Sequence, residues 1–342
     1  MRLASAVLVI AAVVLQWYSH SGGLLTTFDS CTYLSAAESF KANFTFVGID
    51  GQPYTYWSPL FPMVLSLFGS AWYWIQLLLT AWIGVLVVIQ TRKIIEDPSL
   101  QLICQASILL GIHLLLIGTF LWSELLFLLI LLHFMMAVER KQFVAAIILG
   151  FFLCLQRNAG LFFVIAAALW YWDARKSILL FILSSSGFIV WNIYSSAATE
   201  NTYFQWMPHN FEMMIKAMMT SIAPLPGVLF IVVLIGLAFF LKTDPKTRLM
   251  AIMLIIYLAG MAALFHLDVS DGDRYAAVVI PFFMMLVFRA IEIIASKQTP
   301  ATRKLLIILV ACWLVYPAAR TLKNAPQWHK LSFTSYFCAD LN

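Results

Sequence analysis

The chain has 342 residues, of which 63% are hydrophobic and 11% are charged, with a net charge of +5 and a mean hydropathy of +0.91. Soluble proteins carry roughly 25% charged residues, so this composition excludes a soluble domain and predicts an all-α polytopic membrane protein. Its basic residues are scattered in pairs and form no stripe, which argues against a nucleic-acid partner.

Apolar runs recur along the chain and predict about eleven transmembrane helices. A run of about 17–25 apolar residues can cross a bilayer as a helix because the helix satisfies its own backbone hydrogen bonds. The pair at 142–156 and 158–172 is short and is compatible with a hairpin that does not fully cross. We expect spans at 2–18, 71–90, 101–120, 122–138, 142–156, 158–172, 177–197, 222–241, 248–267, 275–294 and 304–320.

The distribution of basic residues predicts the orientation. A cytoplasmic N-terminus places 14 of the 21 Lys and Arg residues on the cytoplasmic side, in agreement with the positive-inside rule. The C-terminus is then non-cytoplasmic. We expect residues 1–320 to form one membrane domain, with a first non-cytoplasmic loop at 19–70 and a non-cytoplasmic tail at 321–342.

The first large loop contains an isolated carboxylate. Residues 29–39 predict an amphipathic interfacial helix with Asp29 or Ser30 as its N-cap. Asp29 either only caps this helix, a role worth about 1 kcal/mol, or acts chemically beside Tyr33. The aromatic run 54–62, which includes Tyr56 and Trp57, is either an interfacial belt or the floor of a lipid-facing groove.

Two further non-cytoplasmic turns carry lone charges. Glu124 begins a predicted helix without a basic residue within four positions. It either snorkels to water or faces a cavity as a metal ligand or an acid–base group. Arg157 has no acidic neighbour in the sequence, and an isolated Arg at such a turn suits an anion, above all a phosphate.

The segment 266–275 is the densest charge cluster of the chain, and it ends in Arg274 and Tyr275. It is either a solvated turn or the entrance of a site, since Arg274 enters the next span and Pro281 follows within it. We expect Asp29, Glu124 and Arg274 to surround one cavity, because all three lie on the same predicted side and carboxylates are costly against lipid.

The cysteines and the missing motifs add two expectations. Cys31 and Cys338 both lie on the predicted non-cytoplasmic side, where a disulfide can persist, but their spacing does not establish one. The sequence holds no GxxxxGK[ST], GxGxxG, HExxH or CxxC motif, which weighs against nucleotide-driven transport, dinucleotide chemistry and zinc proteolysis.

Taken together, these elements resemble the GT-C superfamily of integral-membrane glycosyltransferases, which includes protein O-mannosyltransferases and the enzymes that add aminoarabinose to lipid A. The resemblance covers most of the chain up to about residue 289. It depends on the order and shared sidedness of short motifs: Asp29-Ser30-x-x-Tyr33, Trp57-Ser58-Pro59-Leu60-Phe61-Pro62, Ser123-Glu124-Leu125-Leu126-Phe127, Arg157-x-x-Gly160 and Arg274-Tyr275 with Pro281.

The resemblance implies transfer of a sugar from a polyprenyl-phosphate-linked donor to an acceptor outside the cytoplasm. Asp29 matches the general base, and Arg157 and Arg274 would bind the lipid phosphate. Some relatives use a divalent metal such as Mg²⁺ or Mn²⁺, for which Asp29 and Glu124 would be the ligands here. Tyr33, Tyr56, Trp57 and Tyr275 would line the substrate site.

The chain departs from the family pattern in three ways. Its first loop lacks an Asp-Glu pair and its second loop is a few residues long, which puts the metal in doubt. It has no large soluble C-terminal domain, which indicates a small acceptor or one supplied by a partner protein. The acceptor, whether a glycan, a lipid or a protein, stays open.

Two other functions compete with the glycosyltransferase. A transporter or flippase of a lipid-linked or small anionic substrate would place broken helices at mid-membrane, ideally in two related halves, and neither pattern is visible. A non-catalytic membrane scaffold with a GT-C-like fold is the third possibility. Replacing Asp29 separates it from an enzyme, because a scaffold should tolerate that change.

Overall fold

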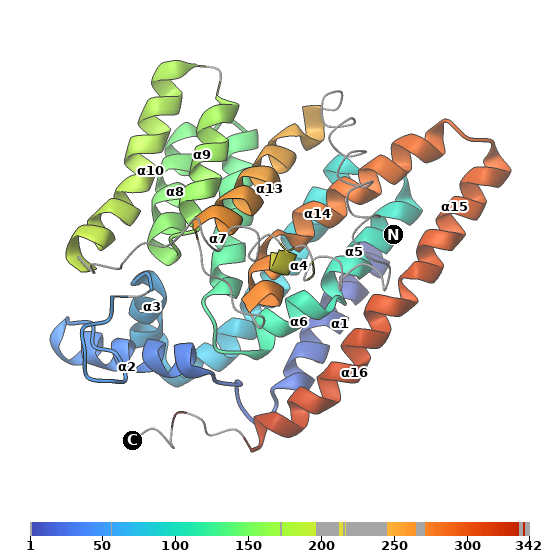
Figure 1. The fold of residues 1–342 in the computed structure, drawn as a ribbon. Helices are drawn as coiled ribbons and strands as arrows, with labels where there is room; N and C mark the ends of the chain where they lie inside the picture. The colour runs from blue at the N-terminus through green and yellow to red at the C-terminus, as the bar shows by residue number, and fades with distance from the viewer. Residues whose placement is uncertain are drawn as a thin grey trace.

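The computed structural model describes residues 2–55, 57–171, 173–195, 212–214, 216, 245–264, 271–334 and 338. Within these residues every named element is a helix (Figure 1). They are α1 (Arg2–Ser19), α2 (Phe28–Asn43), α3 (Leu60–Phe68), the 3₁₀ turn η1 (Gly69–Ala71), α4 (Trp72–Ile94), α5 (Pro98–Leu109), α6 (Ile112–Thr119), α7 (Glu124–Glu139), α8 (Phe143–Gln156), α9 (Gly160–Trp170), α10 (Ala174–Ser195), α13 (Pro245–Leu264), α14 (Asp271–Ser296), α15 (Pro300–Trp313) and α16 (Val315–Ser332).

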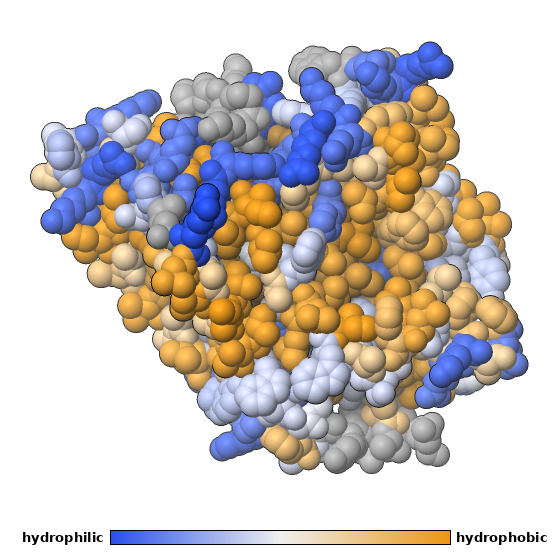
Figure 2. Space-filling model, turned by 180° about the vertical axis from the view of Figure 1, so that it is seen from behind, coloured by the Kyte–Doolittle hydropathy of each residue, from blue (hydrophilic) through white to orange (hydrophobic). Residues whose placement is uncertain are grey.

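Six helical segments are long and apolar enough to cross a bilayer, which confirms a multi-pass membrane protein. Figure 2 shows a broad apolar band on one face of the molecule, bordered on both sides by more hydrophilic side chains. The six segments are Arg2–Ser19, Leu60–Ile94, Pro98–Thr119, Ala174–Ser195, Gly272–Ser296 and Pro300–Ser332.

The predicted number of eleven crossings is not confirmed. Helices cover ten of the eleven predicted spans, and the span at 222–241 lies outside the described residues. Several of these helices are short. The hairpin expected at 142–156 and 158–172 corresponds to α8 with 14 residues and α9 with 11, and at about 1.5 Å per residue neither reaches across a core of roughly 30 Å.

The core lies where α4, α7, α9, α13 and α14 meet, and its fully buried side chains include Phe127, Phe163 and Phe282. Neighbouring helices in the sequence pack as antiparallel partners in several places, since α7 contacts α8 and α8 contacts α9. Helix α14 runs through this core and carries Pro281 in its interior. This packing brings the N-terminal end of α14 close to the turns that precede α7 and α9.

The C-terminal region differs from its predicted form. Residues 321–342 are polar and were expected to be a tail, but α16 continues to Ser332. Pro317, Thr321 and Ala325 recur every four residues and are buried on one face of α16, which packs on α1 and α6. This buried stripe explains how a helix with a polar outer face extends beyond the last apolar run.

A disulfide between Cys31 and Cys338 joins the end of the chain to α2, with the two Cα atoms 5.2 Å apart. The sequence left this pairing open, and the structure forms it. Ser21 contacts Nδ1 of His329 at 2.9 Å, and the Gly22 N–H donates to Ser332 Oγ at 3.1 Å. The C-terminal end therefore lies on the same side of the molecule as the first loop, as the predicted topology requires.

We expect loss of this disulfide to lower stability. Cys338→Ser should cost about 2–5 kcal/mol, because the bond closes a loop with a sequence separation of 307 residues and such bonds stabilise largely by restricting the unfolded chain, although that mechanism is disputed. Thermal unfolding of the detergent-solubilised protein measures the effect. Cys312→Ser, at a free and exposed cysteine, is the control. Alkylation of both Cys31 and Cys338 in unreduced protein would contradict the bond.

Candidate active site

Helix α2 begins one residue earlier than predicted and is not capped by Asp29. Thr27 is the N-cap, and its N–H donates to Ser30 Oγ at 3.0 Å. Thr is among the residues preferred at an N-cap, and Ser30 takes the N3 position of the capping box, where Glu or Gln is usual. The interpretation of Asp29 as a simple capping residue is therefore wrong, and its carboxylate contacts Arg274 instead.

The start of α2 is held against the turn between α6 and α7. The Leu121 N–H donates to Leu25 O at 2.8 Å, and Ser30 Oγ donates to Leu121 O at 2.9 Å. The Trp122 indole N–H donates to Thr27 Oγ1 at 3.0 Å. These bonds join segments about 90 residues apart in sequence, and they fix Asp29 opposite the first residue of α7.

That first residue is Glu124, whose side chain is fully buried. A carboxylate at a helix N-terminus interacts favourably with the helix dipole, but burial on this scale requires charged partners. Arg157 Nη1 lies 2.5 Å from Glu124 Oε1, and Arg274 Nε donates to the same oxygen. The interpretation that Glu124 snorkels to water is wrong.

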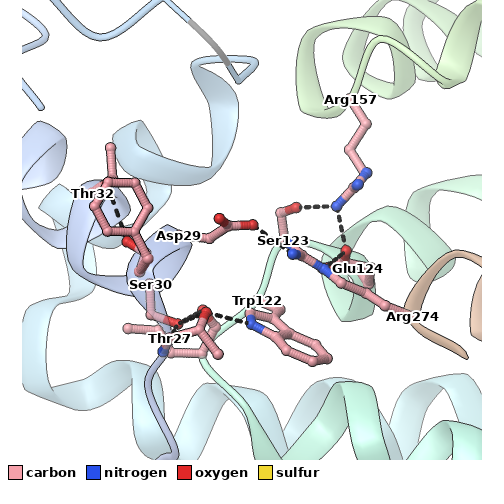
Figure 3. A network of polar contacts seen from close by, with 11 residues as sticks. Thr27, Asp29, Ser30, Thr32, Trp122, Ser123, Glu124, Arg157 and Arg274 are labelled. Carbon is pink, nitrogen blue, oxygen red and sulfur yellow. Dashed lines mark hydrogen bonds and ion pairs between the residues drawn. The ribbon is translucent and has the colours of Figure 1, made fainter. Parts of the chain in front are cut away.

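Arg274 bridges the two carboxylates (Figure 3). Its Nη1 lies 2.5 Å from Asp29 Oδ2 while its Nε contacts Glu124. Its guanidinium carbon lies 4.6 Å from the centre of the Trp122 ring, an arrangement that favours a cation. Arg274 is 5% exposed, so the interpretation of this segment as a solvated turn is wrong for Arg274; residues 265–270 lie outside the described residues.

Arg157 reaches the same cluster from the tight turn between α8 and α9. Its Nη1 also donates to Ser123 Oγ at 2.7 Å, and its guanidinium carbon lies 5.0 Å from the centre of the Tyr275 ring. The turn needs Gly160, because a Cβ at that position would lie 2.4 Å from Leu153 O. The spacing of Arg157 and Gly160 in the sequence thus reflects the geometry of this turn.

A cavity of about 240 Å³ adjoins the cluster on the Arg157 side. Arg274 contacts both Asp29 and Glu124, and none of the three is among the described lining residues, so the expectation that all three surround one cavity is met only in part. Arg157 belongs to both the cluster and the cavity wall. The described lining residues are Tyr33, Trp57, Ser58, Ser123, Gln156, Arg157, Asn158, Ala159 and Tyr275.

Three of the four predicted aromatic site residues line this cavity. Tyr33 is one turn after Asp29 on α2, and its ring lies 5.8 Å from that of Trp57 and 5.0 Å from that of Phe61. Burial raises the pKa of Tyr33 to about 12, so its hydroxyl stays neutral and can donate a hydrogen bond at ordinary pH. Tyr56 lies outside the described residues.

Several site residues were not predicted as such. Trp122 and Ser123 directly precede Glu124, Gln156 and Asn158 flank Arg157, and Ser58 follows Trp57. Each is an uncharged neighbour of a predicted residue. Proximity in sequence was the only available signal, because nothing in the composition of these turns distinguishes a cavity wall from an ordinary loop.

The site does not fit the predicted divalent metal. The Arg274 guanidinium lies between Asp29 and Glu124, the two carboxylates that would hold it, and Arg157 adds a second positive charge. Among the residues that the structure describes, no group of three His, Cys, Asp or Glu side chains could hold a metal ion. The two carboxylates and two guanidinium groups already balance one another.

The fold and the site define a multi-pass helical membrane protein with a buried ion-pair cluster beside a small cavity. Two crystal structures of ArnT from Cupriavidus metallidurans have a similar fold. The form bound to undecaprenyl phosphate gives a TM-score of 0.56 and the apo form 0.53, and in each case the identity is 13% over 98% of this chain and 76% of that chain.

This likeness is one of fold, and it confirms the kind of fold that the sequence resemblance implied. No protein-family model and no curated protein sequence matches the chain.

Proposed function

We propose that the protein is a membrane glycosyltransferase that moves a sugar from a polyprenyl-phosphate-linked donor to an acceptor on the non-cytoplasmic side. The observation that carries the proposal is the cluster of Asp29, Arg274, Glu124 and Arg157, assembled from four separate segments beside a cavity. A fold shared with a protein solved with undecaprenyl phosphate supports the choice of a lipid phosphate.

In the proposed reaction Asp29 accepts the proton of an acceptor hydroxyl. The hydroxyl oxygen forms a bond to the anomeric carbon of the sugar, and the bond from that carbon to the phosphate oxygen breaks. Polyprenyl phosphate leaves with the electron pair. Asp29 is suited to the role of base because its side chain is 21% exposed, whereas Glu124 is fully buried and would serve to hold the two arginines.

Arg157 would stabilise the charge that develops on the departing phosphate, as fixed cationic groups do in other transfer reactions. In the described part of the chain, the polar contacts of Arg157 with Glu124 and Ser123 both use Nη1. Its Nε and Nη2 groups therefore remain for a phosphate in the cavity. Arg274 would contribute indirectly, because its contacts hold the carboxylates of Glu124 and Asp29 in position.

Binding of undecaprenyl phosphate tests this proposal. Arg157→Ala should weaken binding by about 10- to 150-fold, since a hydrogen bond to a charged group contributes about 1.5–3 kcal/mol. Native mass spectrometry or thermophoresis of the purified protein in nanodiscs measures the affinity, and Arg175→Ala, at an exposed position on another turn, is the control. Equal affinities for all three proteins would contradict the proposed phosphate site.

Release of undecaprenyl phosphate from a sugar-loaded lipid then separates an enzyme from a flippase. An enzyme generates the free lipid phosphate in the presence of acceptor, whereas a flippase moves the intact lipid between leaflets of a liposome. Movement without release would contradict the transferase.

The proposed reaction should not need a divalent metal. We expect dialysis against EDTA to leave undecaprenyl phosphate binding and release unchanged, because the Arg274 guanidinium occupies the position between the carboxylates. Elemental analysis of the dialysed protein checks that metal was removed. Arg274→Ala is the comparison: it leaves two carboxylates without the guanidinium and should bind Mn²⁺ more tightly than the parent. Loss of release by the parent in EDTA, restored by Mn²⁺, would contradict the expectation.

A further inference from the structure

We propose that the cavity beside Arg157 is a subsite for the sugar of the lipid-linked donor, and that this sugar is an uncharged monosaccharide. The inference rests on the proposed function and names its substrate class. It follows from the chemistry of the cavity wall, which combines aromatic rings, amide and hydroxyl groups and one guanidinium.

The size of the cavity sets the first limit. The cavity has a volume of about 240 Å³. This volume lies below the ~300–1,000 Å³ typical of sites for larger ligands. A single pyranose ring with its hydroxyl groups matches this size better than an oligosaccharide does.

The polar side chains of the cavity wall offer hydrogen-bond donors and an acceptor that the hydroxyl groups of a ligand can use. Ser58 Oγ donates to Asn158 Oδ1 at 3.0 Å, which orients the amide so that its two N–H donors are available; no described residue accepts from them. Gln156 Nε2 donates to Ser123 O at 2.9 Å, while Gln156 Oε1 is buried without a hydrogen-bond partner among the described residues. An unsatisfied buried acceptor is costly, and a hydroxyl bound in the cavity would satisfy it.

The aromatic groups complete the wall. Trp57, Tyr33 and Tyr275 all line the cavity, and the first two rings meet edge to face at 5.8 Å. A pyranose ring has apolar C–H faces as well as a hydroxyl rim. Convergent amides beside aromatic rings therefore match a sugar better than a purely polar or purely apolar ligand.

The charges indicate that the sugar is neutral. Arg157 is the charged residue among the described lining residues, and it would repel an ammonium group. The nearby carboxylates of Asp29 and Glu124 are already paired with arginines. An amino sugar would thus meet a cation without a carboxylate partner from the described wall, while Arg157 would favour the phosphate attached to the sugar.

Three lipids that differ only in their head group test the inference: undecaprenyl phosphate, undecaprenyl phosphoglucose and undecaprenyl phosphoglucosamine. The purified protein in nanodiscs should bind the glucose lipid about three- to tenfold more tightly than the bare phosphate, as expected for about one net hydrogen bond. The glucosamine lipid should gain no such increment.

Substitutions in the cavity wall test whether the gain in affinity from the glucose head group arises in this cavity. Asn158→Leu and Ser58→Ala should each reduce the ratio of the affinity for the glucose lipid to the affinity for undecaprenyl phosphate, and elution from size exclusion like the parent shows that each variant is folded. Asn158→Asp keeps the acceptor for Ser58 and adds a carboxylate, so it should shift the preference toward the glucosamine lipid. Asn192→Leu, at an exposed position of α10, should bind all three lipids as the parent does.

Three other results of the lipid-binding measurement would each overturn a different part of the proposal. Equal binding of all three lipids by the parent would overturn the sugar subsite but leave the proposed function in place. A parent that prefers the glucosamine lipid would overturn the uncharged class. Failure of all three lipids to bind would overturn the proposed function and this inference with it.

Discussion

Asp29→Asn is expected to lower the rate of sugar transfer by about 10²- to 10⁴-fold, the usual contribution of a general base. Asn keeps the shape of the side chain and can still accept a hydrogen bond from Arg274, but it cannot take up the proton of an acceptor hydroxyl. Because Thr27 rather than Asp29 caps α2, the helix should keep its cap. The measurement is the release of undecaprenyl phosphate by purified protein supplied with sugar-loaded lipid and acceptor.

Asp50→Asn is the matched control, since Asp50 is an exposed carboxylate in the same loop, where it accepts from the Gln52 N–H at 3.1 Å. It should retain the parent rate. Full transfer activity in Asp29→Asn would remove Asp29 from the reaction and would favour a scaffold function for the protein. Both variants should elute from size exclusion as the parent does.

Glu124→Ala is expected to cause the largest loss of stability of any single substitution in the site, about 3–5 kcal/mol. Glu124 Oε1 contacts both Arg157 and Arg274, so its removal leaves two buried guanidinium groups near each other without the carboxylate that they share. The midpoint of thermal unfolding in detergent, together with the fraction that stays monodisperse, measures the loss.

A double variant separates the loss of the ion pair from the loss of the carboxylate itself. Glu124→Gln combined with Arg157→Gln restores a charge-balanced pair of Asp29 and Arg274, and should recover part of the stability that Glu124→Gln alone loses. Glu139→Ala is the control, since Glu139 pairs with Lys93, whose side chain is 41% exposed, and such surface pairs contribute about 0–1 kcal/mol. A Glu124→Ala protein as stable as the parent would show that the cluster is not an energetic centre of the fold.

The comparison of sequence and structure is most informative for the lone charges. Glu124 and Arg157 each lack an oppositely charged neighbour in the sequence, whereas Arg274 ends the charge cluster at 266–275; all three are unusual in a chain so poor in charge. In the structure they are partners of one another and of Asp29. Charge in an apolar chain is costly, so a few isolated charges are a usable signal for a site even when their pairing is unknown.

The sequence could not predict how these charges divide their roles. It treated Asp29 and Glu124 alike as metal ligands, whereas Arg274 lies between them. It placed Asp29 or Ser30 at the helix cap, whereas Thr27 holds that position. Each of these differences depends on where a side chain turns after the helices pack, and side-chain direction at a helix start is not fixed by periodicity.

What the sequence determined by itself is the class of the protein: a multi-pass helical membrane protein. Hydrophobic length and charge sparsity decide this locally, because a backbone in lipid must satisfy its own hydrogen bonds. Only the tertiary structure decided the ion-pair cluster, the cavity beside Arg157 and the bond between Cys31 and Cys338. Each of these joins segments far apart in the chain, and such contacts follow from the packing of the whole bundle.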